Sequence, residues 1–210
     1  MAQNEPVNLA VLLSGGGTTL QNLIDRTEAG KLNAKVRVVV SSRSDAFGLE
    51  RAKRQGIASA VCPSRDYRDF DALSEAVWRE VRKHPVDLVC LAGFMCFIRV
   101  PEDFYGRMMN IHPALIPAFC GRGMYGHRVH EAVLKAGCKV SGCTAHFVDN
   151  EYDHGPIIVQ RAVPVYDTDT PDELAARVFE QECVAYPEAI RLFGEGRLEI
   201  DGRIVRVRER

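Results

Sequence analysis

The chain has 210 residues, a length that fits one α/β domain, and its 46% hydrophobic and 26% charged residues are ordinary for a globular protein. The formal net charge of −1 provides no global basic field, so the composition does not favour nucleic acid as a partner. The apolar runs are too short to span a membrane, and the first ten residues lack the pattern of a signal peptide. Seven cysteines without a C-x-x-C pair favour reduced thiols, and we expect a soluble, cytoplasmic protein.

The first half of the chain alternates predicted strands and helices. A continuous apolar strand at 7–13 precedes a helix at 18–30, whose apolar residues recur at helical spacing. The following predicted elements are strands at 35–42, 57–62 and 86–94 and helices at 45–56 and 67–84. This β-α alternation predicts an α/β fold with a doubly wound, mostly parallel sheet, Rossmann-like in its N-terminal half and flanked by helices.

The pattern changes in the second half. Its predicted elements are a strand running into a proline-containing loop at 107–117, a glycine-rich loop at 118–126, a helix at 127–137, strands at 139–149 and 156–165, and a helix at 170–196. Thr170 is the expected N-cap of the last helix, with Pro171 in its first turn, and Pro187 is expected to kink or divide it. The tail predicts a hairpin about Asp201-Gly202.

No repeat, low-complexity stretch or linker interrupts the sequence. We therefore expect residues 1–210 to form a single domain. It would consist of a first half at about 7–100, a second half at about 101–197 and the C-terminal hairpin.

A glycine-rich loop, SGGGTT at 14–19, joins the first strand to the first helix. Backbone N–H groups at a helix N-terminus favour an anion, commonly phosphate, and Thr18 and Thr19 add hydroxyl donors. The loop lacks the G-x-G-x-x-G dinucleotide pattern, because Leu20 occupies the third glycine position, and it lacks the Lys-Ser/Thr of a P-loop. It favours a monophosphate, and the alternative is a tight turn without a ligand.

Two polar residues, Asn110 and His112, stand in the apolar segment MMNIHPALIP. Strand alternation places both on one face, where an amide donor beside an imidazole suits the stabilisation of an oxyanion and the movement of a proton. Asp153 lies in a later loop, and a carboxylate beside an imidazole raises its pKa. The alternatives are a hydrogen-bonded pair at a strand end and an ordinary Asp turn. The other histidines lack metal-ligand spacing, so no metal is expected.

Several blocks of the sequence together resemble phosphoribosylglycinamide formyltransferases, the folate-dependent enzymes of purine synthesis within the formyltransferase family. The blocks keep the family's order between about Val7 and Arg197, and they are LLSGGGTTLQNLI, DAFGLERA, LAGFM, NIHPALIP, TAHFVD…DHGPII and E…YPEAI. The resemblance implies the formyltransferase fold and transfer of a formyl group from 10-formyltetrahydrofolate, the co-substrate, to the amino group of glycinamide ribonucleotide. It implies neither a metal nor a covalent intermediate.

The resemblance also implies roles for individual residues. The family's catalytic residues correspond to Asn110, His112 and Asp153. The residues that hold the ribose phosphate and hydroxyls correspond to Gly17, Thr18, Thr19 and Glu182. The folate-binding residues correspond to Arg68, Met95, Cys96, Phe97, Ile98 and Asn110. We expect the half at about 7–100 to bind the phosphate and the half at about 101–197 to carry catalysis and folate binding, although several of these folate-binding residues lie before residue 101.

The sequence departs from the family at Cys96, where many members have Arg, and in a longer loop at 118–130. Alternative functions are formyltetrahydrofolate hydrolase, with water as the acceptor, and methionyl-tRNA formyltransferase, both of which carry additional domains. A non-catalytic module that senses a phosphorylated metabolite is a third alternative. We expect two small-molecule substrates as partners, neither nucleic acid nor membrane, and a monomer or homodimer.

Overall fold

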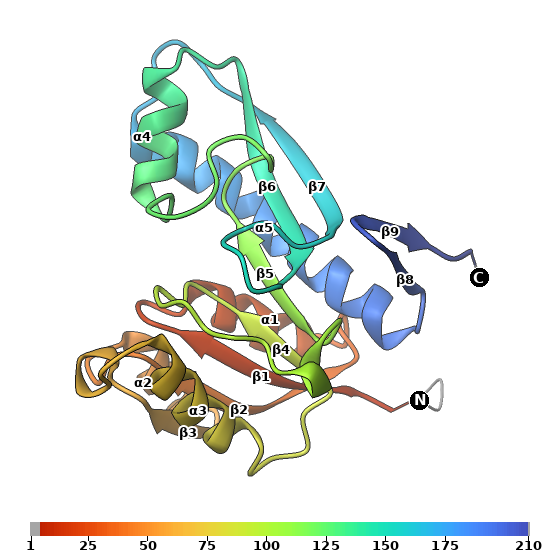
Figure 1. Cartoon of the computed structure of the whole chain (residues 1–210). Helices are drawn as coiled ribbons and strands as arrows, with labels where there is room; N and C mark the ends of the chain where they lie inside the picture. Colours follow the sequence, from red (N-terminus) through yellow and green to blue (C-terminus); the bar gives the residue numbers. More distant parts are fainter. Residues whose placement is uncertain (1–4, 210) are drawn as a thin grey trace. The chain divides into compact units, whose positions relative to one another are not determined.

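The structure is a computed structural model that describes residues 5–209. The chain forms two compact units, one ending at Met109 and the other beginning at Asn110 (Figure 1). This boundary lies close to the predicted division between the halves 7–100 and 101–197. That the two units act as a single domain stays a prediction.

The first unit is a parallel sheet covered by helices. Its elements are β1 (Val7–Leu13), α1 (Thr18–Glu28), β2 (Ala34–Ser41), α2 (Phe47–Arg54), β3 (Ala58–Val61), α3 (Phe70–Val81) and β4 (Leu88–Leu91), with short 3₁₀ turns at Ser64–Asp66 and Glu102–Phe104. The strand order is β3-β2-β1-β4, and all three pairings are parallel. Every side chain from Leu9 to Leu13 is fully buried, as expected for a strand covered on both faces.

The second unit combines parallel and antiparallel pairings. Strand β5 (Met108–His112) leads from the first unit into it, and its other elements are α4 (His127–Lys135), β6 (Val140–Phe147), β7 (Ile157–Pro164), α5 (Pro171–Gly194), β8 (Leu198–Asp201) and β9 (Ile204–Val207). The strand order is β5-β6-β7-β9-β8, with β6–β7 and β8–β9 antiparallel and β7–β9 parallel. Helix α5 packs against β6 and β7, and α4 packs against α5 (Figure 1). The predicted α/β fold with a mostly parallel sheet is confirmed.

Helix α5 begins as predicted. Thr170 and Glu173 form a capping box, with Pro171 in the first turn. Pro187 does not divide the helix, contrary to one of the two outcomes expected from the sequence. Although proline removes one backbone donor, the residues around it, such as Tyr186 and Ile190, are fully buried, so tertiary packing offsets the lost hydrogen bond.

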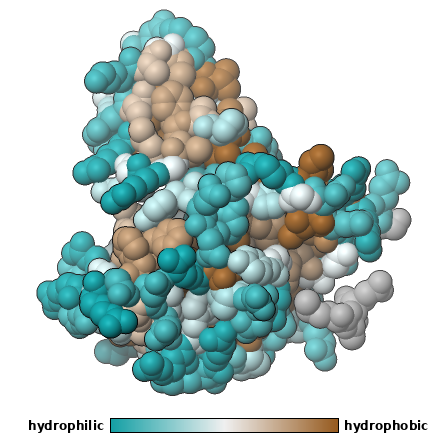
Figure 2. All heavy atoms as spheres, viewed as in Figure 1, coloured by the Kyte–Doolittle hydropathy of each residue, from teal (hydrophilic) through white to brown (hydrophobic). Residues whose placement is uncertain are grey.

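The remaining elements agree with the sequence with small shifts. Strand β5 ends at His112, and the chain then runs into the proline-containing loop, as predicted. The C-terminal hairpin is present, with Gly202 in the left-handed conformation (φ 59°) that its turn requires. None of the seven cysteines, all of which lie in the described residues, forms a disulfide, and three of them are buried. None of the helices in the described part of the chain is long and apolar enough to cross a membrane. Figure 2 shows hydrophobic residues in separate patches among hydrophilic ones.

Candidate active site

The glycine-rich loop of the first unit ends at the N-terminus of α1. Gly17 is the N-cap in a left-handed conformation (φ 69°), and no side chain caps the helix there. A side chain at Gly15 or Gly16 would meet no atom within 4 Å, so the space in front of the loop is open. Free N–H groups of the first helical turn beside open space are the arrangement that binds anions.

Residues of helix α2 donate hydrogen bonds to the carbonyl groups of this loop. The Gly48 N–H donates to the Gly15 carbonyl at 3.0 Å, and Arg51 Nε donates to the Gly16 carbonyl at 2.9 Å. A Cβ at Gly17 would come within 2.7 Å of Gly48 Cα, so the two backbones approach closely only because residue 17 has no side chain. The loop carbonyls are thereby engaged on one side, and the N–H groups of the helix end remain available on the other.

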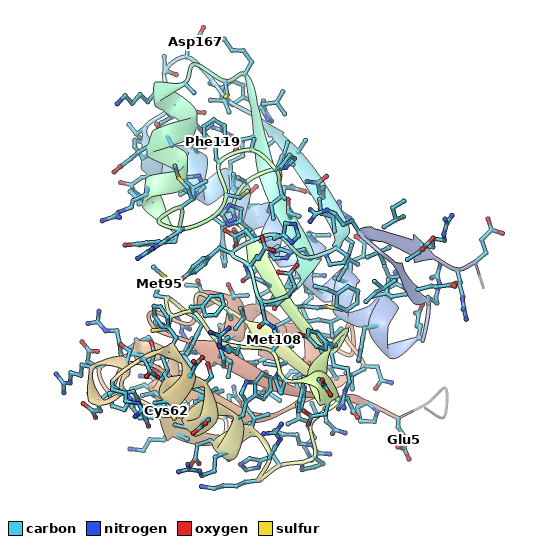
Figure 3. All side chains as sticks on the ribbon, viewed as in Figure 1. Glu5, Cys62, Met95, Met108, Phe119 and Asp167 are labelled. Carbon is cyan, nitrogen blue, oxygen red and sulfur yellow. The ribbon has the colours of Figure 1, made fainter. Side chains whose placement is uncertain are left out.

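The predicted folate segment, Met95 to Ile98, follows β4 in the same unit. The Met95 N–H donates to Ser14 Oγ at 2.8 Å, which ties this segment to the start of the glycine-rich loop. Met95 is half exposed (Figure 3), Ile98 is buried, and Cys96 is partly exposed. Phe97 contacts the exposed Phe70 ring, with 5.8 Å between ring centroids. The segment therefore offers an exposed apolar side chain at Met95 beside the ring of Phe97.

Arg68, the remaining folate-binding prediction, lies on the surface of the first unit. Its side chain is 87% exposed and pairs with Asp69 at 3.1 Å. An exposed pair of this kind contributes little to stability, so the guanidinium is available to a second anion. Its role with the folate tail stays a prediction.

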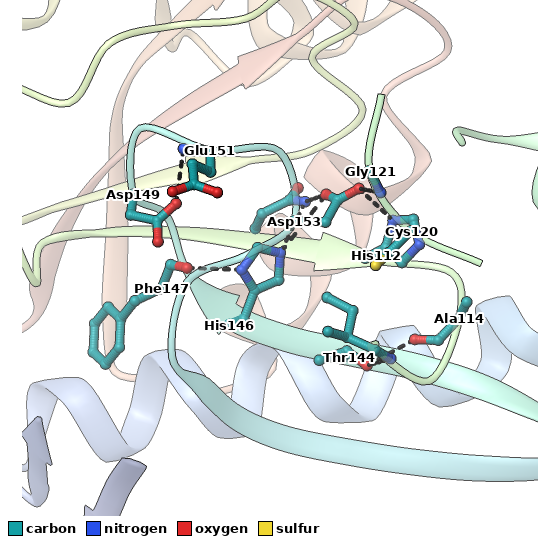
Figure 4. Close-up of polar contacts among 12 residues, drawn as sticks. His112, Ala114, Cys120, Gly121, Thr144, His146, Phe147, Asp149, Glu151 and Asp153 are labelled. Atoms are coloured by element: carbon teal, nitrogen blue, oxygen red, sulfur yellow. Dashed lines mark hydrogen bonds and ion pairs between the residues drawn. The ribbon is translucent and has the colours of Figure 1, made fainter. Parts of the chain in front are cut away.

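Four polar side chains of the second unit converge where β5 and β6 lie side by side, and we refer to them as the β5–β6 polar cluster (Figure 4). They are Asn110, His112, His146 and Asp153. Asn110 and His112 come from β5, His146 comes from β6, and Asp153 comes from the loop after β6. The sequence predicted three of the four members.

The three predicted members lie within reach of one another. Asp153 Oδ2 lies 3.6 Å from His112 Nδ1, and Asp153 Oδ1 accepts from Asn110 Nδ2 at 3.4 Å. The Asp153 carboxylate thus bridges the two β5 residues. Its side chain is 13% exposed and that of His112 is 4% exposed, so these interactions operate largely out of water.

The backbone of Asp153 is held in an uncommon conformation. Its φ of 51° is left-handed, which aspartate tolerates better than most residues but which still costs free energy. The Gly121 N–H donates to Asp153 Oδ2 at 2.9 Å and supports that position. Strain maintained at a buried carboxylate is typical of a functional site.

His112 is already engaged on its second nitrogen. Its Nε2 donates to the Phe119 carbonyl at 2.8 Å, and Phe119, on the loop between β5 and α4 (Figure 3), has a left-handed φ of 50°. Because Nε2 carries this hydrogen, the unprotonated form of Nδ1 would direct a lone pair at Asp153. The geometry therefore suits an imidazolium paired with the carboxylate. A substrate oxygen that takes the Nε2 hydrogen must displace the Phe119 carbonyl.

His146 is the member of the cluster that sequence reasoning missed. It is 1% exposed, its Nε2 lies 3.3 Å from Asn110 Nδ2, and its Nδ1 lies 2.7 Å from the Phe147 carbonyl. Burial lowers its pKa. The signal that could have found it is a polar residue inside the buried strand CTAHF.

Thr144 fixes the path of the chain after β5 (Figure 4). Its hydroxyl donates to the Ala114 carbonyl at 2.7 Å and accepts from the Ile116 N–H at 3.1 Å. Gln160 of β7 donates to the same hydroxyl at 3.0 Å. These contacts hold the loop that follows His112.

Glu182, the predicted ribose-binding acid, lies on α5. The residue is partly exposed, yet its carboxyl is surrounded closely enough that burial raises its pKa to about 7. Burial, and then the charge of Glu182, raises the pKa of the Cys143 thiol on β6 to about 12. A buried carboxylate that lacks compensation is suited to accept hydrogen bonds from hydroxyl groups.

Two further histidines have polar partners that the sequence did not indicate, and a third, His130, is buried. His154 lies between Asp149, at 2.7 Å, and Arg203 of the C-terminal hairpin. His127 pairs with Asp172 at 2.7 Å. Burial and the neighbouring histidines lower the pKa of His130 to about 4. Among the described residues, no group of three or more His, Cys, Asp or Glu side chains is arranged to hold a metal ion.

Residues 7–190 match the sequence model of the formyl transferase family, and the chain belongs to that family. The resemblance to phosphoribosylglycinamide formyltransferases is confirmed. The chain is 38% identical over 196 residues to the Escherichia coli (strain K12) phosphoribosylglycinamide formyltransferase, which covers 92% of this chain and 90% of that protein. It is 42% identical over 194 residues to the chloroplastic phosphoribosylglycinamide formyltransferase of Arabidopsis thaliana, which covers 91% of this chain and 66% of that protein.

The fold comparison agrees. The crystal structure of glycinamide ribonucleotide transformylase 1 from Symbiobacterium toebii matches with a TM-score of 0.92 at 43% identity, covering all of this chain and 96% of that one. The chain spans about two thirds of the length of the Arabidopsis relative and 20% or less of trifunctional purine biosynthetic relatives.

The close approach of Gly17 to Gly48 predicts a selective loss of stability. Gly17→Ala should lower the free energy of unfolding by at least about 1–2 kcal/mol, because a left-handed alanine is strained and its Cβ would clash with α2. Gly16→Ala, the matched control, should change it by less than about 1 kcal/mol, because its Cβ meets nothing. Urea unfolding of the purified variants measures both values. Equal stability of the two variants would contradict the packing described.

The pKa of Glu182 predicts a pH-dependent stability difference. Its pKa of about 7 lies above the ordinary 4.5. Between pH 4.5 and pH 7, Glu182 therefore keeps its proton in the native state, whereas in the unfolded chain it has lost it. Stability from this group is therefore present below pH 4.5 and lost as the pH rises through 7. The free energy of unfolding of Glu182→Gln, measured relative to that of the wild type by urea unfolding, should rise by on the order of 3 kcal/mol from pH 5 to pH 8. A constant difference would refute the raised pKa.

Proposed function

We propose that the chain is a phosphoribosylglycinamide formyltransferase that transfers the formyl group of 10-formyltetrahydrofolate to the amino group of glycinamide ribonucleotide in purine synthesis. The observation that carries the proposal is the convergence of Asn110, His112 and Asp153 in the β5–β6 polar cluster of a formyl transferase family member. The close relatives from Escherichia coli and Arabidopsis support the choice of acceptor.

The glycine-rich loop is proposed to bind the 5-phosphate of the ribonucleotide. Its open face and the uncapped N-terminus of α1 supply backbone donors at Gly17, Thr18 and Thr19. Glu182 is proposed to accept hydrogen bonds from the ribose hydroxyls. Binding donors at a carboxylate stabilises its charged form, so substrate binding should lower the pKa of Glu182.

The segment at 95–98 and Arg68 are proposed to bind the folate. The exposed Met95 offers contacts to a flat ring, and the guanidinium of Arg68 offers a charge to a carboxylate tail. Cys96 supplies no such charge, so the folate tail would depend on Arg68 alone among these residues.

The chemical step is an addition and elimination at the formyl carbon. The neutral amine of the ribonucleotide forms a bond to that carbon, and negative charge grows on the formyl oxygen. Asn110 Nδ2 and the imidazolium of His112 donate to this oxygen, and a lost donor of this kind typically raises the barrier by about 2.7–4 kcal/mol. The bond from the carbon to folate N10 then breaks. The amine proton reaches the leaving nitrogen with the Asp153 carboxylate as the relay, directly or through water.

His112 can act this way only after the Phe119 carbonyl releases Nε2. The hydrogen bond between them keeps the donor satisfied in the absence of substrate. We propose that the formyl oxygen replaces this carbonyl. The glycine-rich segment at 118–126 supplies the backbone freedom for the change.

The other expectations follow from this assignment. The partners are the two small-molecule substrates, the location is the cytoplasm, and the protein acts as a monomer or homodimer. No metal is assigned a role.

The proposal predicts that His112→Ala and Asp153→Asn each lower kcat at least about a hundredfold, because each change removes a group that acts at the reacting atoms. A spectrophotometric assay with glycinamide ribonucleotide and 10-formyltetrahydrofolate measures the rate. His84→Ala, outside the cluster, should retain wild-type kcat.

A reaction without the ribonucleotide separates the competing functions. Formyl transfer that requires the acceptor supports the proposal. Rapid formyl release into water without the acceptor would identify a hydrolase instead, and turnover of both variants near the wild-type rate would remove these residues from the mechanism.

A further inference from the structure

We propose that His146 is a positioning residue that orients the Asn110 amide, so that its NH₂ group, and not its carbonyl oxygen, faces the reacting formyl oxygen. This inference rests on the proposed function, which assigns Asn110 the role of donor. It adds a role for a side chain outside the predicted catalytic residues.

The first step is the tautomer of His146. Its Nδ1 lies 2.7 Å from the Phe147 carbonyl, which can only accept, so Nδ1 carries the hydrogen (Figure 4). The side chain is 2% exposed, and burial lowers its pKa, which leaves the ring neutral near pH 7. In a neutral ring with Nδ1 protonated, Nε2 is a hydrogen-bond acceptor.

The second step is the orientation of Asn110. An acceptor at His146 Nε2 requires a donor from Asn110, so the atom 3.3 Å away must be the amide nitrogen. The reverse orientation would place the amide carbonyl against a lone pair, and against the Asp153 carboxylate on its other side. The imidazole therefore selects one of two orientations that an asparagine would otherwise exchange.

The third step is which hydrogen remains for the substrate. The two amide hydrogens are directed at His146 Nε2 and at Asp153 Oδ1. The Asp153 carboxylate keeps two further partners at its other oxygen, with Gly121 N–H at 2.9 Å and His112 Nδ1 at 3.6 Å from Oδ2, whereas His146 Nε2 has Asn110 as its close donor. The hydrogen on the Asp153 side is therefore the one that a formyl oxygen can take without stranding a buried group.

The charged groups that face His146 are Asp153, His112 and Asp149. Burial lowers the pKa of His146, and the charge of His112 acts in the same direction; together they outweigh the Phe147 hydrogen bond and the two carboxylates, which favour a charged ring. Asp153 Oδ1 lies 4.0 Å from His146 Nε2, and the Asn110 amide nitrogen lies within hydrogen-bond distance of both acceptors.

A nuclear magnetic resonance experiment tests the tautomer without any turnover. Nitrogen-15 spectra of the histidine rings in the ligand-free wild-type protein should show His146 neutral, with the hydrogen on Nδ1, from pH 6 to pH 8. A ring that carries the hydrogen on Nε2, or that becomes charged in this range, would overturn the proposal. A wild-type protein with this tautomer but without formyl transfer would refute the proposed function and not the orientation.

Two matched variants test the consequence for catalysis. His146→Asn keeps a donor near the Nδ1 position for the Phe147 carbonyl and removes the acceptor, whereas His146→Gln keeps an acceptor near the Nε2 position. We expect His146→Asn to lower kcat about 10- to 100-fold with little change in either KM, because a small error in donor placement is costly to catalysis. His146→Gln should recover most of this loss.

A double-mutant cycle distinguishes positioning from a structural role. In the Asn110→Ala background, His146→Asn should lower kcat no further, because the residue through which it acts is absent. An equal loss in both backgrounds, or equal kcat for His146→Asn and His146→Gln, would overturn the proposal. Thermal unfolding of each variant shows whether a loss of kcat arises from misfolding. If a variant does not fold, kcat is compared only between the variants that do.

Discussion

The second unit depends on one constraint, which is that polar groups taken out of water must find partners inside the protein. His112 and His146 are both nearly inaccessible, and each of their ring nitrogens faces a protein atom that can pair with it. These partners come from two strands and two loops, so satisfying the polar groups also fixes the paths of those loops. The same contacts that complete the folded structure therefore place Asn110, His112 and Asp153 together, and the chemistry assigned to them uses groups that the fold already holds in position.

The first unit satisfies its polar groups in a different way. There the glycine-rich loop directs its carbonyls to α2, through Gly48 and Arg51, and leaves the N–H groups of the α1 terminus without a side-chain cap. A set of free donors at a helix end is incomplete until an anion arrives. The two units thus differ in how their polar groups are satisfied. In the proposed function a ligand completes the loop, whereas the β5–β6 polar cluster is complete in itself and would exchange one internal hydrogen bond, that of the Phe119 carbonyl, for a bond to the substrate.

Much of this could be predicted from local sequence. The apolar run at 7–13 followed by glycines indicates a buried strand and an anion-binding turn, and alternation along β5 places Asn110 and His112 on one face. Local patterns singled out Asp153 without connecting it to the β5 residues, and the family resemblance made that connection and added Glu182. The missed features depend on long-range geometry. His146 was missed because its role depends on which strand pairs with β5. The hydrogen bond from His112 to the Phe119 carbonyl was missed because it depends on the path of the loop after β5. The continuity of α5 through Pro187 depends on packing that propensity does not describe.

The central claim is that the formyl oxygen receives hydrogen bonds from Asn110 and His112. The most direct measurement is a crystal structure of the protein with glycinamide ribonucleotide and a non-transferable formyl folate analogue. The account predicts the formyl oxygen at about 2.7–3.1 Å from both Asn110 Nδ2 and His112 Nε2, with the Phe119 carbonyl displaced from His112. A formyl oxygen beyond hydrogen-bond reach of both side chains, with the Phe119 carbonyl still bound to His112, would contradict it.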